Sequence, residues 1–249
     1  MSGHSKWHSI KHKKAVVDAR RGQQFTKLAR AITVAAREGG GDPDGNSGLA
    51  LAVQKARDAS MPKDNIERAI AKGTGEGADA DQIETVLYEG YAPGGVALLI
   101  EAMTDNRNRT GADIRHLFTK HGGNLGEPGS VSYLFDKRGV IVIDAARYGE
   151  DDLMGAIDAG ALDISLDDDV FEVITEPADL VTVRRALEEA GVEIESAAVS
   201  QLPKSRVPVG ENEASRLMKL IDALEESDDV SSVDANFDVD SAVLERMAS

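Results

Sequence analysis

The hydrophobic residues in the first third of the chain recur at helical spacing. Residues 22–38 (GQQFTKLARAITVAARE) place apolar side chains on one helical face, and three glycines at 39–41 end the segment. The apolar residues of that face are Phe25, Leu28, Ala29, Ile32 and Ala36. Two further helices are predicted, one at 48–59 with Ser47 as its cap and one from Pro62 to about residue 72. Three short helices with tight turns predict a helical bundle.

Beyond the glycine-rich joint at 73–77 (GTGEG), strand patterns and helix patterns alternate. Strands are predicted at 85–91 and 96–103 around a hairpin turn at 92–95, followed by a helix at 110–121 and a strand at 131–135. Residues 138–200 then carry strand patterns at 140–143, 169–175 and 193–199 and helix patterns at 151–158 and 179–190. That stretch is typical of a compact βαββαβ unit.

The last part of the chain is too short to fold alone. It contains one predicted helix at 212–225 and one strand at 233–237, the elements that the unit at 83–135 lacks. We therefore expect three domains: a basic helical domain at 1–78, a discontinuous α+β domain at 79–136 plus 202–249, and an inserted α+β domain at 137–201. The predicted fold class is α+β multidomain, a three-helix bundle followed by two ferredoxin-like-type domains.

Composition narrows the classes of protein that fit. The chain of 249 residues has 41% hydrophobic but only 4% aromatic residues, so its cores must be mainly aliphatic. It has no cysteine, which excludes disulfides, thiolate metal sites and cysteine catalysis and fits a reducing compartment. The sequence has no apolar run long enough for a membrane span and no signal-peptide pattern. We expect a cytoplasmic protein without a membrane partner.

Charge is distributed unevenly along the chain. Residues 1–72 carry 14 Lys and Arg against 7 Asp and Glu, whereas residues 73–249 carry 14 against 37. The first part therefore has a net charge of +7 and the rest −23, although the whole chain sums to −16. Such an asymmetry indicates a basic module for a polyanion on an acidic body.

The basic N-terminal residues are the main candidates for contact with nucleic acid, since several cations on one surface neutralise phosphates and release counterions. The candidates are Lys6, Trp7, Lys11, His12, Lys13, Lys14, Arg20, Arg21, Lys27 and Arg30. Two interpretations of Trp7 stay open: it stacks on a base, or it holds the N-terminal arm against the bundle. Lys27 and Arg30 lie about one turn apart on the predicted helix and would face the same phosphate backbone.

A second candidate contact lies in the TDNRNRT segment at 104–110, between a predicted strand and a predicted helix. Backbone N–H groups at a helix start attract anions, and Arg107 and Arg109 would add bidentate phosphate contacts. The alternative is an ordinary capped turn in which Asp105 or Asn106 satisfies the start of the helix. The sequence alone does not decide between these two interpretations.

The sequence gives little support for metal binding, nucleotide binding or catalysis. His4, His8 and His12 recur every four residues, but neighbouring lysines would repel a metal ion and no cysteine completes a zinc site. The DPDGN turn at 42–46 lacks the later ligands of a calcium loop, and GTGEG lacks the lysine of a phosphate loop. The chain has no GxSxG or HExxH motif. We expect no metal, cofactor or small-molecule substrate, and no enzymatic activity.

Several phrases occur together in a recognisable order: GHSKW at 3–7, IKHKKA at 10–15, RGQQFTKLARAITVAAREGGGDP at 21–43, MPKDNIERAI at 61–70, YEGYAPGG at 88–95, TDNRNRT at 104–110 and HGGNLG at 121–126. Jointly they resemble the YebC family of probable transcriptional regulatory proteins, over essentially the whole chain. The resemblance implies three domains, a location in the cytoplasm, and DNA binding with control of transcription.

The same family includes a mitochondrial translational activator, so the resemblance also implies a second class of function. In that alternative the protein is a ribosome-associated translation factor that binds ribosomal or transfer RNA. The sequence has no recognition helix rich in base-reading side chains, which disfavours strongly sequence-specific DNA binding. Both functions use the same basic N-terminal region, and the polymer stays undecided from sequence.

Overall fold

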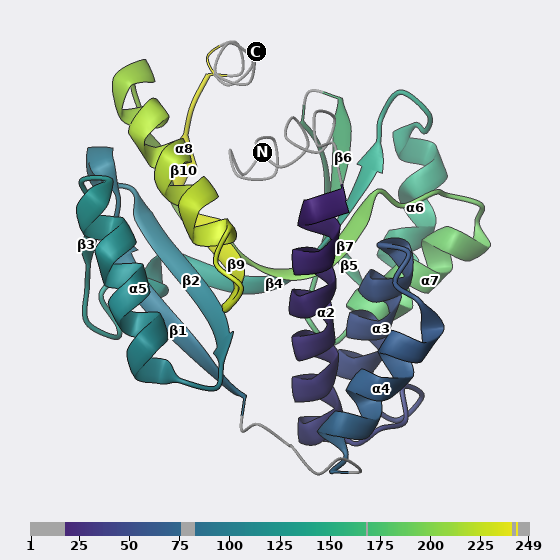
Figure 1. Ribbon diagram of the computed structural model, residues 1–249. Helices are drawn as coiled ribbons and strands as arrows, with labels where there is room; N and C mark the ends of the chain where they lie inside the picture. The colour runs from purple at the N-terminus through teal and green to yellow at the C-terminus, as the bar shows by residue number, and fades with distance from the viewer. Residues whose placement is uncertain (1–17, 76–82, 168, 241–242, 244–249) are drawn as a thin grey trace. The chain divides into compact units, whose positions relative to one another are not determined.

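The computed structural model describes residues 18–75, 83–167, 169–240 and 243, with residues 18–21 described by their backbone alone. These residues form two compact units (Figure 1). One unit contains the described residues up to Phe135 and from Pro203 onward, and the other contains those of Asp136–Leu202. The predicted α+β class is confirmed, and each unit is described by itself below.

Three helices form a bundle within the first unit. Helix α2 (Asp18–Gly39) packs against both α3 (Ser47–Asp58) and α4 (Lys63–Gly73). Their shared core is aliphatic, as composition predicted, and is built from Leu28, Ile32, Leu49, Val53, Ile66 and their neighbours. The backbone of α4 approaches α2 closely, because a Cβ on Gly73 would lie 2.4 Å from the carbonyl oxygen of Thr33. Only glycine fits that position.

The cap of the second helix differs from the prediction. Asn46, rather than Ser47, caps α3: its Oδ1 accepts a hydrogen bond from the Leu49 N–H at 3.0 Å. Its Nδ2 donates to the carbonyl oxygens of Ala35 at 2.8 Å and Gly40 at 2.9 Å. A serine side chain is too short to reach both the helix start and the preceding helix. One amide therefore fixes the whole α2–α3 turn.

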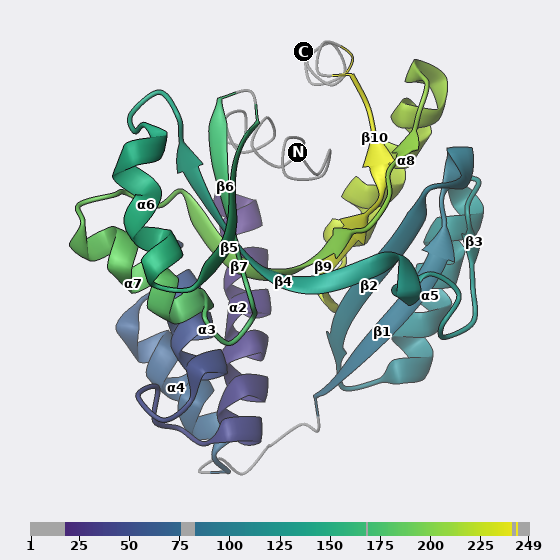
Figure 2. The ribbon, with the colours of Figure 1, turned by 180° about the vertical axis from the view of Figure 1, so that it is seen from behind.

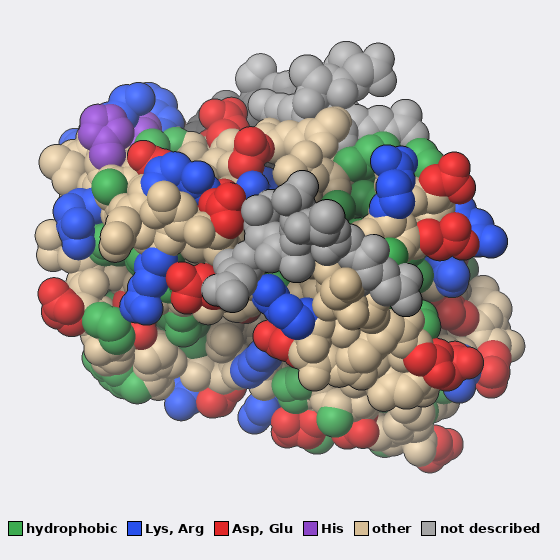
Figure 3. All heavy atoms as spheres, turned by 60° about the horizontal axis from the view of Figure 1, so that its bottom comes forward, with side chains coloured by type: hydrophobic (Ala, Val, Ile, Leu, Met, Phe, Trp, Pro, Cys, Tyr) green, Lys and Arg blue, Asp and Glu red, His purple; other side chains and the backbone are tan. Residues whose placement is uncertain are grey.

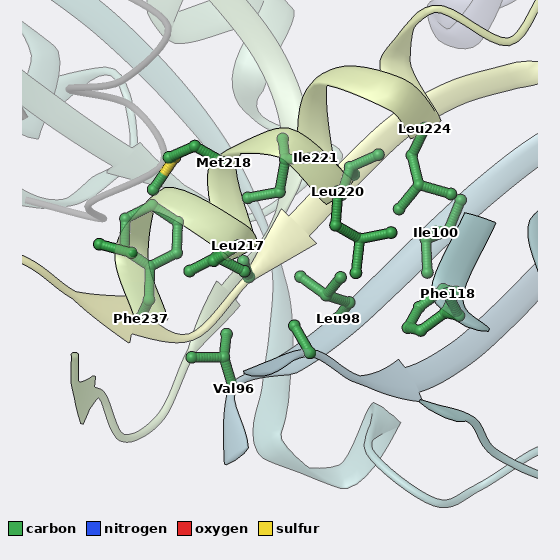
Figure 4. Packing of buried hydrophobic residues seen from close by; sticks show 14 of the residues in the cluster. Val96, Leu98, Ile100, Phe118, Leu217, Met218, Leu220, Ile221, Leu224 and Phe237 are labelled. Atoms are coloured by element: carbon green, nitrogen blue, oxygen red, sulfur yellow. The ribbon is translucent and has the colours of Figure 1, made fainter. Parts of the chain in front are cut away.

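An antiparallel sheet forms the rest of the first unit, in the order β3-β1-β2-β9. Its strands are β1 (Glu84–Tyr91), β2 (Ala97–Thr104), β3 (Asn124–Leu125) and β9 (Val230–Ala235). Helices α5 (Arg107–Lys120) and α8 (Glu211–Glu225) pack on one face. Figure 4 shows Leu220 and Leu224 of α8 facing Leu98 and Ile100 of β2. Strand β9 pairs with β2, so the end of the chain completes this sheet.

The predicted strand at 131–135 is wrong. Ser132–Leu134 form a 3-10 turn (η2), and the next strand, β4 (Phe135–Asp144), begins where the prediction ended. The reason is the buried carboxylate of Glu89, which accepts hydrogen bonds from the N–H groups of Gly129, Val131 and Ser132 at 2.7–2.8 Å. Burial alone would raise the pKa of Glu89, but these hydrogen bonds lower it below its ordinary value. The amides that a strand would use are thus already occupied.

The unit Asp136–Leu202 is a βαββαβ sandwich with strand order β5-β6-β4-β7. After β4 come α6 (Glu150–Asp158), β5 (Ala161–Asp167), β6 (Val170–Thr175), α7 (Leu180–Glu189) and β7 (Ser196–Pro203) (Figure 2). The sequence patterns indicated this layout but did not locate β5. Two short segments complete the fold of the other unit, β8 (Val207–Pro208) and β10 (Phe237–Asp238), which pair in parallel. No helix in the described ranges is long and apolar enough to span a membrane.

Candidate nucleic-acid interface

Most of the predicted contact residues lie at the very start of the chain. Lys6, Trp7, Lys11, His12, Lys13 and Lys14 are outside the described residues, as are His4 and His8. Arg20 and Arg21 fall within α2, but only their backbone is described. The two interpretations of Trp7 therefore stay predictions, and the geometry below concerns the four remaining candidates and their neighbours.

Lys27 and Arg30 lie on α2, as predicted, and both contact the end of α8 in the same unit. Lys27 Nζ donates to the carbonyl oxygen of Glu225 at 2.5 Å, and Arg30 Nη1 donates to that of Asp228 at 2.9 Å. The last carbonyl groups of a helix have no partner within it and carry partial negative charge. Lys27 thus satisfies the C-terminus of α8 and Arg30 binds the turn that follows it, roles that the sequence did not suggest.

Asp229 holds the strongest cluster of charged contacts in this region. Its carboxylate accepts hydrogen bonds from Arg30 Nη1 at 2.6 Å, Arg109 Nη2 at 2.9 Å and Thr110 Oγ1 at 2.6 Å. Only 10% of its side chain is exposed. Burial by itself raises the pKa of Asp229, but the hydrogen bonds from Thr110, Arg109 and Arg30 outweigh it and lower the pKa to about 2. The carboxylate therefore links α2, α5 and the start of β9.

The TDNRNRT segment forms a capped helix start. Asn106 is the N-cap of α5, and its Oδ1 accepts from the Arg109 N–H at 3.1 Å, as the alternative interpretation of this segment predicted. Arg109 also pairs with Asp105 at 2.8 Å, in addition to its contact with Asp229. Arg107 is exposed, and among the described residues its guanidinium has no carboxylate within ion-pair distance. The two arginines, which we predicted to act together, therefore differ: Arg109 is engaged in ion pairs and, within the described part of the chain, Arg107 is not.

A groove of about 480 Å³ lies along α2 and α4. Three cations line it: Arg30 from α2, and Arg68 and Lys72 from α4. Phe25, Met61, Asn65 and one acid, Asp105, are also part of its wall, and Asp105 is paired with Arg109. Sequence reasoning missed Arg68 and Lys72, although their spacing of four residues on a predicted helix was a usable signal. The groove combines positive charge, an aromatic ring and an amide, the groups that contact phosphates and bases in single-stranded nucleic acid.

Positive charge is divided rather than continuous on the face drawn in Figure 3. On the face in Figure 3, most Lys and Arg side chains have Asp or Glu side chains beside them. Paired examples include Lys63 with Glu67 at 3.4 Å and Arg147 with Glu193 at 2.6 Å. Cations that face a neighbouring carboxylate contribute less to the attraction of a polyanion. The residues with the least such neutralisation in the sequence are those of the N-terminal arm, where residues 1–17 contain no acid.

Models of known families match nearly the whole chain. The TACO1/YebC N-terminal domain matches residues 5–76, and the TACO1/YebC second and third domain matches residues 83–237. The chain belongs to the TACO1/YebC family. The resemblance inferred from its motifs is therefore confirmed, and it extends over the bundle, the discontinuous sheet and the unit Asp136–Leu202.

Relatives within the TACO1/YebC family are similar over their full length. A protein of Rubrobacter xylanophilus is 56% identical and one of Thermobifida fusca is 53% identical, with 100% of each chain covered in both cases. Both are named probable transcriptional regulatory protein, a description of a regulator rather than an enzyme. The crystal structure of a conserved hypothetical protein from Aquifex aeolicus matches with a TM-score of 0.82 at 49% identity, over 90% of this chain and 93% of that one.

The two arginines at the start of α5 should respond differently to substitution. Arg109→Ala removes two ion pairs and is expected to lower the urea midpoint of unfolding. Arg107→Ala is expected to leave that midpoint unchanged but to weaken binding to nucleic acid, with the slope of log affinity against log salt falling by about 0.9. Equilibrium unfolding and salt titrations of both variants test this. If Arg107→Ala binds as tightly as the unaltered protein at every salt concentration, this segment is a capped turn and nothing more.

Proposed function

We propose that this protein is a cytoplasmic, nucleic-acid-binding regulator that binds DNA and controls transcription, and that it has no enzymatic activity. The observation that carries the proposal is the segregation of charge: +7 within residues 1–72 and −23 in the rest of the chain. Membership of a family whose relatives are named probable transcriptional regulatory proteins supports the regulatory part. Counterion release on phosphate neutralisation supplies most of the binding free energy in such a protein.

In this proposal the N-terminal arm makes the main contacts. Lys6, Lys11, Lys13 and Lys14 neutralise phosphates, with Arg20 and Arg21 extending the contact along α2. Lys27 and Arg30 support the site indirectly, since both already donate to groups at the end of α8 or to Asp229. Arg68 and Lys72, which line the groove of the bundle, add further contacts to phosphates.

A second candidate function is a ribosome-associated translation factor that binds ribosomal or transfer RNA. One specific observation favours it: the strongly acidic remainder of the chain would repel a long duplex that ran alongside it. A site on a ribosome offers a compact stretch of RNA framed by protein. The groove with Phe25 and Asn65 also fits an unpaired nucleotide better than a stacked duplex.

The contribution of the groove is testable with a double substitution. Arg68→Ala combined with Lys72→Ala is expected to weaken binding severalfold and to reduce the salt slope by about 0.9 for each cation on duplex DNA or about 0.7 on a single strand. Fluorescence anisotropy with labelled duplex and single-stranded probes measures both quantities. Arg57→Ala is the matched control, because Arg57 is an exposed cation of the same bundle outside the groove. Equal losses in the control and the double variant would remove the groove from the site.

Sedimentation of a cell lysate, with crosslinking and sequencing of the attached nucleic acid, separates the two functions. Recovery of promoter DNA with the protein is expected if it regulates transcription. Recovery in ribosomal fractions with ribosomal or transfer RNA would establish the translation factor instead. A protein that crosslinks to neither polymer would contradict both proposals, because each depends on the basic N-terminal region.

A further inference from the structure

Four large hydrophobic side chains are exposed on α6 and β5 of the unit Asp136–Leu202. Met154 is 52% exposed, Ile157 43%, Leu162 53% and Leu166 59%. Helix α6 packs against β5, the strand that directly follows it (Figure 2), and the exposed side chains of these two adjoining elements are here named the α6–β5 surface. Single exposed apolar residues are common, but four gathered on adjoining elements are typical of an interaction site.

The backbone of β5 is also open to a partner. It pairs antiparallel with β6 and stands at the end of the sheet order β5-β6-β4-β7, and no described strand lies on its other side. An edge strand presents a row of N–H and C=O groups that can pair with another extended segment. The strand has seven residues, which is long enough to direct such pairing.

The register of β5 defines which side chains an added strand would meet. Ile164 is opposite Val173 and Leu166 is opposite Phe171, two buried residues of β6, so the apolar face of the sheet continues to its edge. Asp163, opposite Ile174, lies on the other face. A strand placed beside β5 would therefore be most stable with apolar side chains next to Ile164 and Leu166 and a cation next to Asp163.

Charge identifies the class of partner. Residues 136–202 contain 17 Asp and Glu against 5 Lys and Arg, a net charge of −12. Three of these acids, Glu150, Asp151 and Asp158, are exposed on α6, the helix that carries Met154 and Ile157. Such a surface repels nucleic acid and disfavours a second copy of itself, since an isologous contact would bring the same acids together. It attracts a basic protein segment.

We propose that the α6–β5 surface binds a basic segment of another protein, with alternating apolar and cationic residues, which adds to β5 as a strand. The apolar side chains of the segment lie against Leu166 and the exposed side chains of α6, and its cations lie on the other face of the sheet, next to Asp163. Proteins that bind nucleic acid are rich in such basic segments. One protein assembled on a nucleic acid would thus be held by the acidic unit, while the N-terminal arm contacts the polymer.

The test uses the full-length protein and labelled synthetic peptides in fluorescence anisotropy. An eight-residue peptide of alternating lysine and valine is the probe, and alternating glutamate and valine is its control. The probe is expected to bind, with an affinity that falls as salt rises, and the control is not. Leu166→Lys is expected to weaken binding of the probe at least tenfold, as is Leu162→Lys. Tyr133→Lys is the matched control, because Tyr133 is 62% exposed but lies in the other unit.

A probe N-methylated on alternate residues tests strand addition itself, since it cannot form hydrogen bonds along one edge. Its binding should fall to the level of the glutamate peptide, and unchanged binding would overturn the added strand. If neither peptide binds, the acids and the β-bulge at Ala161–Asp163 only protect the edge from pairing. Dimerisation that Leu166→Lys abolishes would assign the surface to a second copy instead. Nucleic-acid binding of the same variants should not change. A failure of the peptide-binding proposal can therefore be distinguished from a failure of the proposed function.

Discussion

Removal of residues 1–14 is expected to lower affinity for duplex nucleic acid by roughly three orders of magnitude at 0.1 M salt, because four lysines are lost and each neutralised phosphate contributes a slope of about 0.9 in log affinity against log salt. The truncated protein should keep its folded structure, since the cores seen among the described residues of both units are built from residues beyond position 24. Anisotropy titrations across a range of salt concentrations, with circular dichroism of the same samples, measure affinity and folding together.

Substitutions in the N-terminal arm distinguish the effect of its charge from the effect of its particular side chains. Replacement of Lys6, Lys11, Lys13 and Lys14 by arginine keeps the charge and should retain the affinity and the salt slope. Replacement of the same four residues by glutamine should reproduce the effect of the truncation. If the glutamine variant binds as tightly as the arginine variant, phosphate neutralisation by the arm is not the source of affinity. Arg107 and the groove residues would then be the next candidates.

The sequence predicted helices and cores better than it predicted the strands at edges. Helix α2 follows directly from the spacing of Leu28 and Ile32, because a stripe of buried aliphatic residues dominates its energetics. Strand β5 was not located, although Leu162, Ile164 and Leu166 alternate with Asp163, Ser165 and Asp167 as in a strand with one apolar face. The alternation does not reveal that Leu162 and Leu166 are more than half exposed at the edge of the sheet, which is the feature that defines the α6–β5 surface.

The roles of the charged residues were less accessible to sequence reasoning than the helices. Lys27 and Arg30 have the composition and spacing of phosphate contacts, but their partners lie about 200 residues later in the chain, at Glu225, Asp228 and Asp229. The spacing of residues within one helix does not indicate a partner so far away in the chain. Arg68 and Lys72 were overlooked although their spacing of four residues places them on one face of a predicted helix. That helix carries acids as well, and the packing of α4 on α2 is what forms the groove beside both cations.

Asp229→Asn is expected to reduce the free energy of unfolding at pH 7 by about 2 kcal/mol. The pKa of the carboxyl is lowered from 3.8 to about 2 in the folded protein, and each pKa unit corresponds to about 1.4 kcal/mol. Asparagine keeps an oxygen that can accept from Thr110 but removes the negative charge that faces Arg30 and Arg109. Urea unfolding followed by circular dichroism measures the difference. Asp228→Asn is the matched control, because the adjacent Asp228 is exposed and only its carbonyl oxygen is used by Arg30.

The same substitution has a predictable dependence on pH. A folded-state pKa below the unfolded value means that the ionised carboxylate stabilises the folded state, so this stabilisation is fully present above about pH 4 and is lost as the pH falls toward 2. The gap in unfolding free energy between the unaltered protein and Asp229→Asn should therefore narrow as the pH falls from 5 to 2.5, while Asp228→Asn follows the unaltered protein throughout. A gap that stays constant over this range would mean that Asp229 acts through hydrogen-bond geometry alone. No gap at pH 7 would mean that the buried charge is balanced by the cost of its desolvation, and that α2 is held to α8 by the contacts of Lys27 and Arg30 with backbone carbonyls.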